Sequence, residues 1–305
     1  MRPARAAGAA ALAAMTLAAA FATWVLLRLF FGAAEGLLFV ATETWVNEAI
    51  DDAVRGRTAA IYTTALAGGF AFGPLLIRFT GTEGAVPFLA AAAVVLAGVG
   101  VLGLAGGSAP RIGGAPLFGL AGYLAALPVA VGASALFGFA DGGLISMLTV
   151  YGLGLGFGEA KAASLVTALV LGGIVLMMPF GWLVDRFDRR RIVVGCAASA
   201  AVAIAVVPAL SASTPALYAA LFGIGGLLGS LWLVAMTLLG ERFRGTDLAA
   251  ANVGLTFAYG IGSLAGPAVA GAAQGAWPPH GMLPPIALGG VAVAGWTPPA
   301  PAAAA

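Results

Sequence analysis

Charged residues are too scarce in this chain for it to fold in water. Asp, Glu, Lys and Arg make up 9% of the 305 residues, whereas soluble domains carry about 25%, and 61% of the chain is hydrophobic. Many apolar runs are about 20 residues long, the length that spans a bilayer as a helix. We therefore predict an all-α polytopic membrane protein. The same composition excludes a soluble enzyme, a disordered chain and a nucleic-acid-binding protein.

Ten apolar runs are bounded by charged residues or by Pro and Gly clusters, and each predicts one membrane-spanning helix. The expected spans are 6–23, 26–49, 58–78, 86–105, 126–150, 159–183, 192–211, 215–239, 248–272 and 281–297. The first could instead be a signal peptide, because Arg2 and Arg5 precede an Ala-rich segment. The last is weak, because Pro284 and Pro285 interrupt it.

Basic residues are divided unevenly between the two sides of this topology. Arg28, Arg78 and Lys161 fall on one side. The other side receives Arg2, Arg5, Arg55, Arg57, Arg111, Arg186, Arg189, Arg190, Arg191, Arg242 and Arg244. Loops rich in Lys and Arg remain in the cytoplasm. The pattern predicts a bacterial inner-membrane protein whose Arg-rich loops are cytoplasmic.

Cysteine and histidine occur once each, as Cys196 and His280. A single cysteine forms no internal disulfide, and a single histidine excludes a His-based metal site or catalytic triad. We expect no enzyme activity, no metal and no other cofactor.

The loop after the sixth expected span carries the strongest local signal. It reads Gly181-Trp-Leu-Val-Asp185-Arg-Phe-Asp-Arg-Arg-Arg191. Gly181 permits close approach of two helices, and Asp185 can offer its carboxylate to the N-terminus of a neighbouring helix. The arginines hold the loop in the cytoplasm and can pair with Asp185. A plain positively charged loop is the alternative interpretation.

Two stretches of the chain share one order of features. Each has a Phe-Gly pair, then an acidic residue, an Arg-Gly turn and a Gly-x-x-x-Gly-Pro segment. The segments consist of Gly69, Gly73 and Pro74 in the first stretch and Gly262, Gly266 and Pro267 in the second. Glycine lets two helix backbones approach, and proline bends a helix. Such an internal repeat is typical of transporters.

Four charged residues fall within the expected spans: Arg28, Glu35, Glu43 and Asp141. A charge at the bilayer centre costs about 2.5–3.5 kcal/mol on the insertion scale, so such residues are candidates for function. We expect Asp141 or Glu35 to bind and release a proton. The alternative is structural: Glu35 locks its helix through Arg28, and Asp141 bonds to backbone.

Four aromatic or polar residues are candidates for lining a cavity, with plain helix packing as the alternative. They are Tyr62, Trp232, Asn252 and Tyr259.

These residues together resemble the major facilitator superfamily of secondary transporters. Residues 181–190 are similar to its signature loop, Gly-x-Leu-x-Asp-Arg-x-x-Arg-Arg, with Asp188 where Gly is usual. Arg28-x-x-x-Gly32 is similar to the motif that opens the family's fourth helix, and residues 69–74 to a fifth-helix motif common in exporters. Residues 43–47 look like the corresponding sequence in a poorly characterised bacterial branch of small-molecule permeases.

The resemblance implies two helical bundles joined by a linker. It assigns 1–105 to an incomplete N-terminal bundle (family helices 3–6) and 106–125 to a cytoplasmic linker. Residues 126–297 become the six-helix C-terminal bundle, and 298–305 a disordered tail. The family's first two helices would be missing, through a late start or a real shortening. The resemblance also implies that Asp185, Arg186 and Arg189, with Gly181 and Arg190 in the same motif, form a cytoplasmic gate.

The implied function is secondary active transport of a small organic solute by alternating access. We expect proton coupling, and the exporter-type motif favours efflux. The expected partners are the lipid bilayer, the solute and protons. The alternatives are a transport-inactive shortened carrier or structural membrane protein, and a ten-helix drug/metabolite transporter, which would show an inverted repeat.

Overall fold

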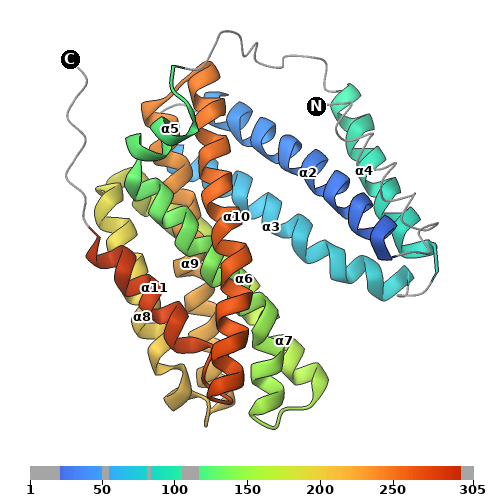
Figure 1. The fold of residues 1–305 in the computed structure, drawn as a ribbon, viewed down its shortest axis with the longest axis vertical. Helices are drawn as coiled ribbons and strands as arrows, with labels where there is room; N and C mark the ends of the chain where they lie inside the picture. Colours follow the sequence, from blue (N-terminus) through green and yellow to red (C-terminus); the bar gives the residue numbers. More distant parts are fainter. Residues whose placement is uncertain (1–20, 50–54, 81–83, 105–116, 297–305) are drawn as a thin grey trace. The chain divides into compact units, whose positions relative to one another are not determined.

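A computed structural model of the protein describes residues 21–49, 55–80, 84–104 and 117–296 (Figure 1). Within those ranges the regular structure is entirely helical, as predicted. The helices are α2 (Phe21–Ala49), α3 (Arg55–Thr80), α4 (Val86–Leu104), α5 (Leu120–Ala126), α6 (Pro128–Gly154), α7 (Glu159–Arg186), α8 (Arg189–Leu210), α9 (Thr214–Arg242), α10 (Gly245–Ala276) and α11 (Leu283–Gly295).

Each expected span from 26–49 onward coincides with one of these helices, and α5 is additional. The expected span 6–23 lies almost wholly outside the described residues, as does the expected tail, 298–305. At the other end of the chain, Pro284 and Pro285 do not interrupt a helix. They stand in the first turn of α11, where proline needs no amide hydrogen.

Six of the described helices are long and apolar enough to cross a membrane: α2, α6, α7, α8, α9 and α10. Shorter apolar stretches occur in α4 (Val86–Gly98) and in α11. Large apolar side chains also lie on the outside of the helices; Leu264 on α10, for example, is 81% exposed. These surfaces require an apolar solvent, so the fold is that of a polytopic membrane protein.

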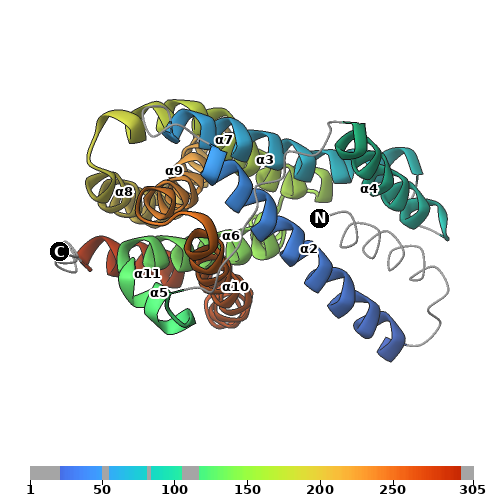
Figure 2. The same ribbon diagram turned by 90° about the horizontal axis from the view of Figure 1, so that it is seen from above.

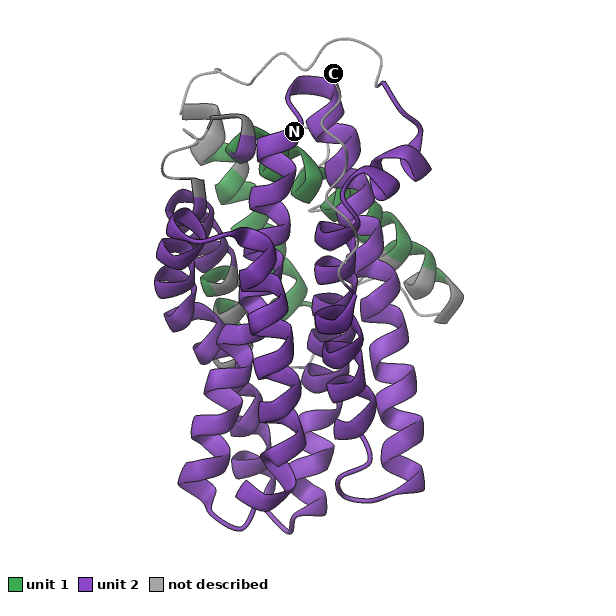
Figure 3. Ribbon diagram, turned by 90° about the vertical axis from the view of Figure 1, so that its left-hand side faces the viewer, with its two compact units in different colours: residues 1–46, 68–112 green, residues 47–67, 113–305 purple. Residues whose placement is uncertain are grey.

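The chain divides into two compact units (Figure 3). The first comprises residues 1–46 and 68–112, and the second comprises residues 47–67 and 113–305. This division differs from the predicted one, in which residues 47–67 belonged to the N-terminal bundle. Asn47 illustrates why, because its side-chain amide donates a 3.2 Å hydrogen bond to the Met236 carbonyl on α9.

The second unit is built around α9. Its buried side chains come from every side of the helix and include Leu221, Leu231 and Met236. Helix α9 packs against α7, α8 and α6, while α6 packs against α10 and α11 pairs with α8. Figure 2 shows this bundle nearly end-on, with α9 between α7 and α8 and with α6 beside α10.

Glycine residues let two of these helix pairs approach closely. A Cβ added at Gly172 on α7 would lie 1.8 Å from the Phe222 carbonyl oxygen on α9. On α10, a Cβ at Gly262 would lie 2.1 Å from the Ala135 carbonyl oxygen, and one at Gly266 equally close to that of Phe139, both on α6. These contacts fix the α6–α10 pair, which carries part of the candidate site.

Candidate functional site

The chain reverses direction between α7 and α8 within two residues. Phe187 leaves the helical conformation, and the Asp188 side chain accepts a 2.9 Å hydrogen bond from the Arg191 amide. Asp188 therefore caps the N-terminus of α8, a role for which aspartate is well suited. This explains aspartate at a position where the resembled loop has glycine.

Asp185, in the last turn of α7, bonds to the first turn of α3. The Gly56 amide donates to Asp185 Oδ1 at 2.6 Å, and the Arg57 amide donates to Oδ2 at 3.1 Å. Arg57 Nε also donates to Oδ2 at 3.1 Å. The Asp185 side chain is only 6% exposed, whereas that of Arg57 is 52% exposed. We call this arrangement of Asp185, Gly56 and Arg57 the clasp.

Two glycines make room for the clasp. A Cβ added at Gly56 would lie 2.5 Å from Asp185 Oδ1 and 2.6 Å from the Gly181 carbonyl oxygen. A Cβ at Gly181 would lie 2.7 Å from that of Ala60 and 2.9 Å from the Gly56 carbonyl oxygen. The two backbones therefore touch, which leaves the carboxylate facing the amides at the helix N-terminus, where an anion is favoured.

The arginines of the loop do not pair with Asp185, contrary to expectation. Arg186 stacks over the Trp182 ring at 4.1 Å, and Arg189 forms a 2.8 Å ion pair with Glu241 at the end of α9. Consecutive side chains on a helix point about 100° apart, so the Arg186 side chain does not point toward α3 as that of Asp185 does. Arg190 is half-buried in the first turn of α8.

A second polar site lies within the α6, α9 and α10 helices. The Tyr259 hydroxyl donates a long, 3.4 Å hydrogen bond to Asp141 Oδ2. The ring of Tyr259 lies 5.6 Å from that of Trp232 and 5.5 Å from that of Phe137, which itself is 6.1 Å from Trp232. Trp232 is buried, and the other three residues are half-buried. We call these four residues the acid–aromatic cluster.

The other charged candidates lie apart from this cluster. Glu35 is exposed on α2, and Glu43, one helix turn from Asn47, is fully buried. The Arg28 side chain lies outside what the structure describes, so its pairing with Glu35 remains a prediction. Of the two remaining cavity candidates, Tyr62 is half-buried on α3 and Asn252 is buried on α10.

The two Gly-x-x-x-Gly-Pro segments differ in their surroundings. Gly262 and Gly266 contact α6, as described above, and Pro267 lies inside α10. At Gly69 an added Cβ would meet no described atom within 4 Å, so the close approach expected there stays a prediction. The surroundings of Gly73 and Pro74 lie outside the described part of the chain.

The segment before α5 is tied to the start of α10. Asp247 accepts a 2.8 Å hydrogen bond from the Leu117 amide and another from the Tyr123 hydroxyl. Burial and the neighbouring Asp247 carboxylate raise the pKa of the Tyr123 phenol. The phenol therefore stays protonated and remains a donor. This contact lies at the end of the second unit that also holds the clasp.

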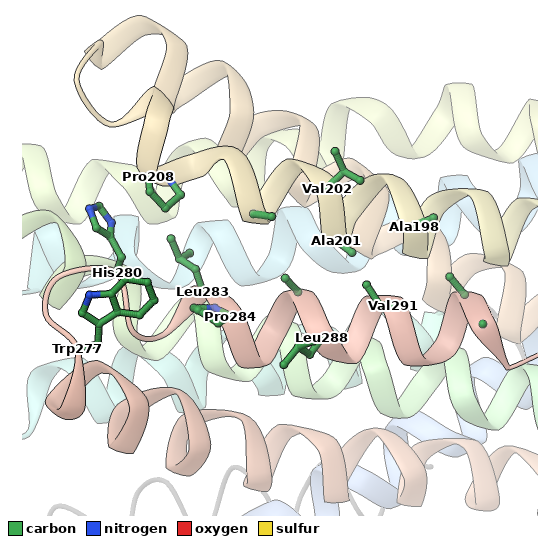
Figure 4. Close-up of a pocket in the computed structure, with 14 residues that line it drawn as sticks. Ala198, Ala201, Val202, Pro208, Trp277, His280, Leu283, Pro284, Leu288 and Val291 are labelled. Carbon is green, nitrogen blue, oxygen red and sulfur yellow. The ribbon is translucent and has the colours of Figure 1, made fainter.

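A groove of about 680 Å³ runs between α8 and α11 (Figure 4). Its lining is apolar, from Ala198 and Val202 on α8 to Leu288 on α11, with Trp277 and His280 at one end. His280 Nδ1 lies 3.1 Å from the Tyr151 hydroxyl. The groove carries no carboxylate, so the clasp and the acid–aromatic cluster are the stronger candidates. Among the described residues, no group of three His, Cys, Asp or Glu could hold a metal.

Sequence reasoning missed three residues of these sites. Gly56 belongs to the Arg-Gly turn of the internal repeat, Arg55-Gly56, and Arg57 follows it. The recurrence of that turn was the available signal for a helix N-terminus with a partner. Phe137 precedes Asp141 by four residues, so both lie on one face of α6. That spacing could have been found from the sequence.

Comparison with known proteins gives matches at the level of the family. The sequence profile of the Major Facilitator Superfamily matches residues 130–304. Relatives named uncharacterized MFS-type transporters include YfkF of Bacillus subtilis, 26% identical over 81% of this chain and 65% of the relative. YE1530 of Yersinia enterocolitica is 28% identical over 83% of this chain and 66% of that protein. The chain thus spans about two thirds of the length of these relatives.

Solved structures show the same fold. The E. coli fucose:proton symporter FucP matches 96% of this chain and 80% of its own length, with 16% identity and a TM-score of 0.74. The human organic anion transporter MFSD10 matches 96% of this chain and 75% of its own, with 15% identity and a TM-score of 0.77. Since the family profile covers more than half of the sequence, this chain belongs to the Major Facilitator Superfamily.

Proposed function

We propose that this chain acts in secondary active transport of a small organic solute, by alternating access across a bacterial inner membrane. The observation that carries the proposal is the clasp, in which a buried carboxylate holds a helix N-terminus from a distant part of the chain. Its hydrogen bonds and ion pair can form and break repeatedly at low cost. A gate that opens and closes in each transport cycle needs a contact of this kind.

The clasp lies at the Arg-rich end of the second unit, which also carries Arg186, Arg189, Arg242 and Arg244. Basic loops remain in the cytoplasm, so this orientation makes the clasp the cytoplasmic gate. With the clasp closed, a solute site within the helices would communicate with the other side of the membrane. Breaking the clasp would open the path to the cytoplasm.

Proton coupling is assigned to Asp141. It lies in the middle of α6, and none of the described basic side chains forms an ion pair with it. An ionisable group within a membrane span is expensive to retain and commonly serves ion or substrate movement. Export is the favoured direction, because the Gly-x-x-x-Gly-Pro segment resembles an exporter motif.

The test uses the purified full chain in liposomes loaded with a fluorescent pH indicator. Sugars, carboxylates and amines are added outside in turn, without an imposed gradient. We expect at least one class to change the internal pH in chain-containing liposomes but not in empty ones, and the Asp141→Asn variant to lose this change. If none of these solutes changes the internal pH of chain-containing liposomes beyond the change in empty ones, the proposal is wrong.

A further inference from the structure

We infer that the acid–aromatic cluster recognises the positively charged nitrogen of an organic cation. Asp141 supplies the negative charge, the Tyr259 hydroxyl contacts its carboxylate, and the ring of Phe137 lies 5.5 Å from that of Tyr259, so two aromatic rings stand next to the acid. The inference deepens the proposed function and rests on it, because it names the substrate class for the intramembrane site. Carboxylates and aromatic faces together form the usual environment for ammonium groups in proteins.

The geometry favours a cation over a neutral or anionic solute. The carboxylate of Asp141 is half-buried, and its hydrogen bond with Tyr259 is long. This bond satisfies one oxygen weakly, so a stronger donor can replace it. An anion at this place would meet the Asp141 carboxylate, which would repel it.

The rings are held in place by their neighbours. Trp232 is buried and contacts both other rings, so it supports Phe137 and Tyr259. On the α6 side, a Cβ at Gly138 would lie 2.2 Å from the Tyr259 carbonyl oxygen. The two helices that carry Asp141 and Tyr259 are thus in backbone contact next to the cluster. A site fixed in this way retains affinity because little must be ordered on binding.

The basic residues of the second unit do not neutralise the site. In the described part of that unit, arginine and lysine lie at helix ends, such as Arg57 and Arg242 at one end and Lys161 at the other. Lys161 contacts the Thr214 hydroxyl and the Phe157 ring instead. A solute cation would therefore supply the positive charge that Asp141 lacks.

The experiment measures binding at equilibrium, with the full chain in lipid nanodiscs and no gradient. The probes are benzyltrimethylammonium, its neutral carbon analogue neopentylbenzene and the anion phenylacetate, each titrated calorimetrically. We expect only the cation to bind. Asp141→Asn should weaken its binding about tenfold to a hundredfold, as loss of bonds to a charged group does. Tyr259→Leu and Phe137→Leu should each weaken it about threefold to thirtyfold, the range of cation–π contacts.

Two variants serve as matched controls. Glu159→Gln removes an exposed carboxylate in the first turn of α7, and Phe257→Leu removes an exposed ring on α10, two residues from Tyr259. Both should bind the cation as the unmodified chain does. If Asp141→Asn fails to fold, the two ring variants still test the site.

Failure of the inference differs from failure of the proposed function. Absence of cation binding, equal binding of the neutral probe, or unchanged affinity in Asp141→Asn and both ring variants would overturn the inference. Transport of an anion or a sugar would then still support the proposed function. If the chain binds the cation through Asp141 but moves no solute, the inference is supported and the proposed transport function is wrong.

Discussion

The amide nitrogen of Gly56 lies 2.6 Å from Oδ1 of Asp185, although 129 residues separate them in sequence. Two of the three hydrogen bonds that Asp185 accepts in the clasp come from backbone amides of α3. The contact therefore depends on the N-terminus of α3 more than on one basic side chain. This makes the carboxylate hard to replace and the arginine easier to replace.

Asp185→Asn should lower transport strongly while leaving membrane insertion intact. The amide keeps the size of the carboxylate but loses its charge, and hydrogen bonds to charged groups contribute about 1.5–3 kcal/mol. Arg57→Gln should have a milder effect, because ion pairs with exposed side chains contribute about 0–1 kcal/mol. Initial rates in proteoliposomes, at matched protein incorporation, measure both. Unchanged transport by Asp185→Asn would contradict the gating role.

Gly56→Ala should disturb the clasp without touching either charge. The added methyl group would lie 2.5 Å from Asp185 Oδ1 and 2.6 Å from a backbone oxygen, so the helices must separate. Overpacking of this kind costs about 1–3 kcal/mol. The matched control is Gly195→Ala on α8, where the methyl group meets no atom within 4 Å. Thermal unfolding of both variants in one detergent measures the cost of the added methyl group, and equal melting temperatures would count against the clash.

The helices could be predicted from the sequence because the thickness of a bilayer sets the length of each apolar run that spans it. The span expected at 159–183, for example, corresponds to α7. The break at Pro128 between α5 and α6 was not anticipated. Leu127 leaves the helical conformation there, as a residue before a proline tends to do, so Pro128 itself was an available signal.

Several residues of the two sites were predictable from the sequence, but the contacts between them were not. Asp185 stands out because its loop has a recognisable spacing, but its partner Arg57 lies 128 residues away. Nothing in the loop itself distinguishes Arg57 from Arg186 as the partner. In the same way, Asp141 is conspicuous as an intramembrane charge and Tyr259 was a candidate for lining a cavity, but nothing in the sequence pairs the two. Tertiary packing decides such pairs.

Gly262→Ala should destabilise the α6–α10 pair. Its methyl group would lie 2.1 Å from the Ala135 carbonyl oxygen, a backbone atom that cannot rotate away. Gly260→Ala, on the same helix, meets no atom within 4 Å and should improve local helix propensity slightly. Thermal unfolding of both variants in one detergent compares them directly. A melting temperature for Gly262→Ala equal to that for Gly260→Ala would show that the close approach is not needed.

Arg189 and Glu241 should form a pair of modest, salt-sensitive strength between the α7–α8 turn and the end of α9. Their atoms lie 2.8 Å apart, but the side chains are 23% and 34% exposed, so the expected contribution is about 1 kcal/mol or less. Arg189→Glu should destabilise the protein by placing two carboxylates together. The double variant Arg189→Glu with Glu241→Arg should recover most of the loss, because it restores opposite charges.

Chemical unfolding of the two single variants and the double variant, at low and high salt, measures the coupling between the residues. Arg190→Glu, at the next position on α8, controls for a general charge effect in this basic turn. High salt should lower the coupling energy, because the screening length between exposed charges is about 10 Å at 0.1 M salt and falls as the salt concentration rises. A double variant no more stable than Arg189→Glu alone would mean that the two side chains are neighbours without a productive ion pair.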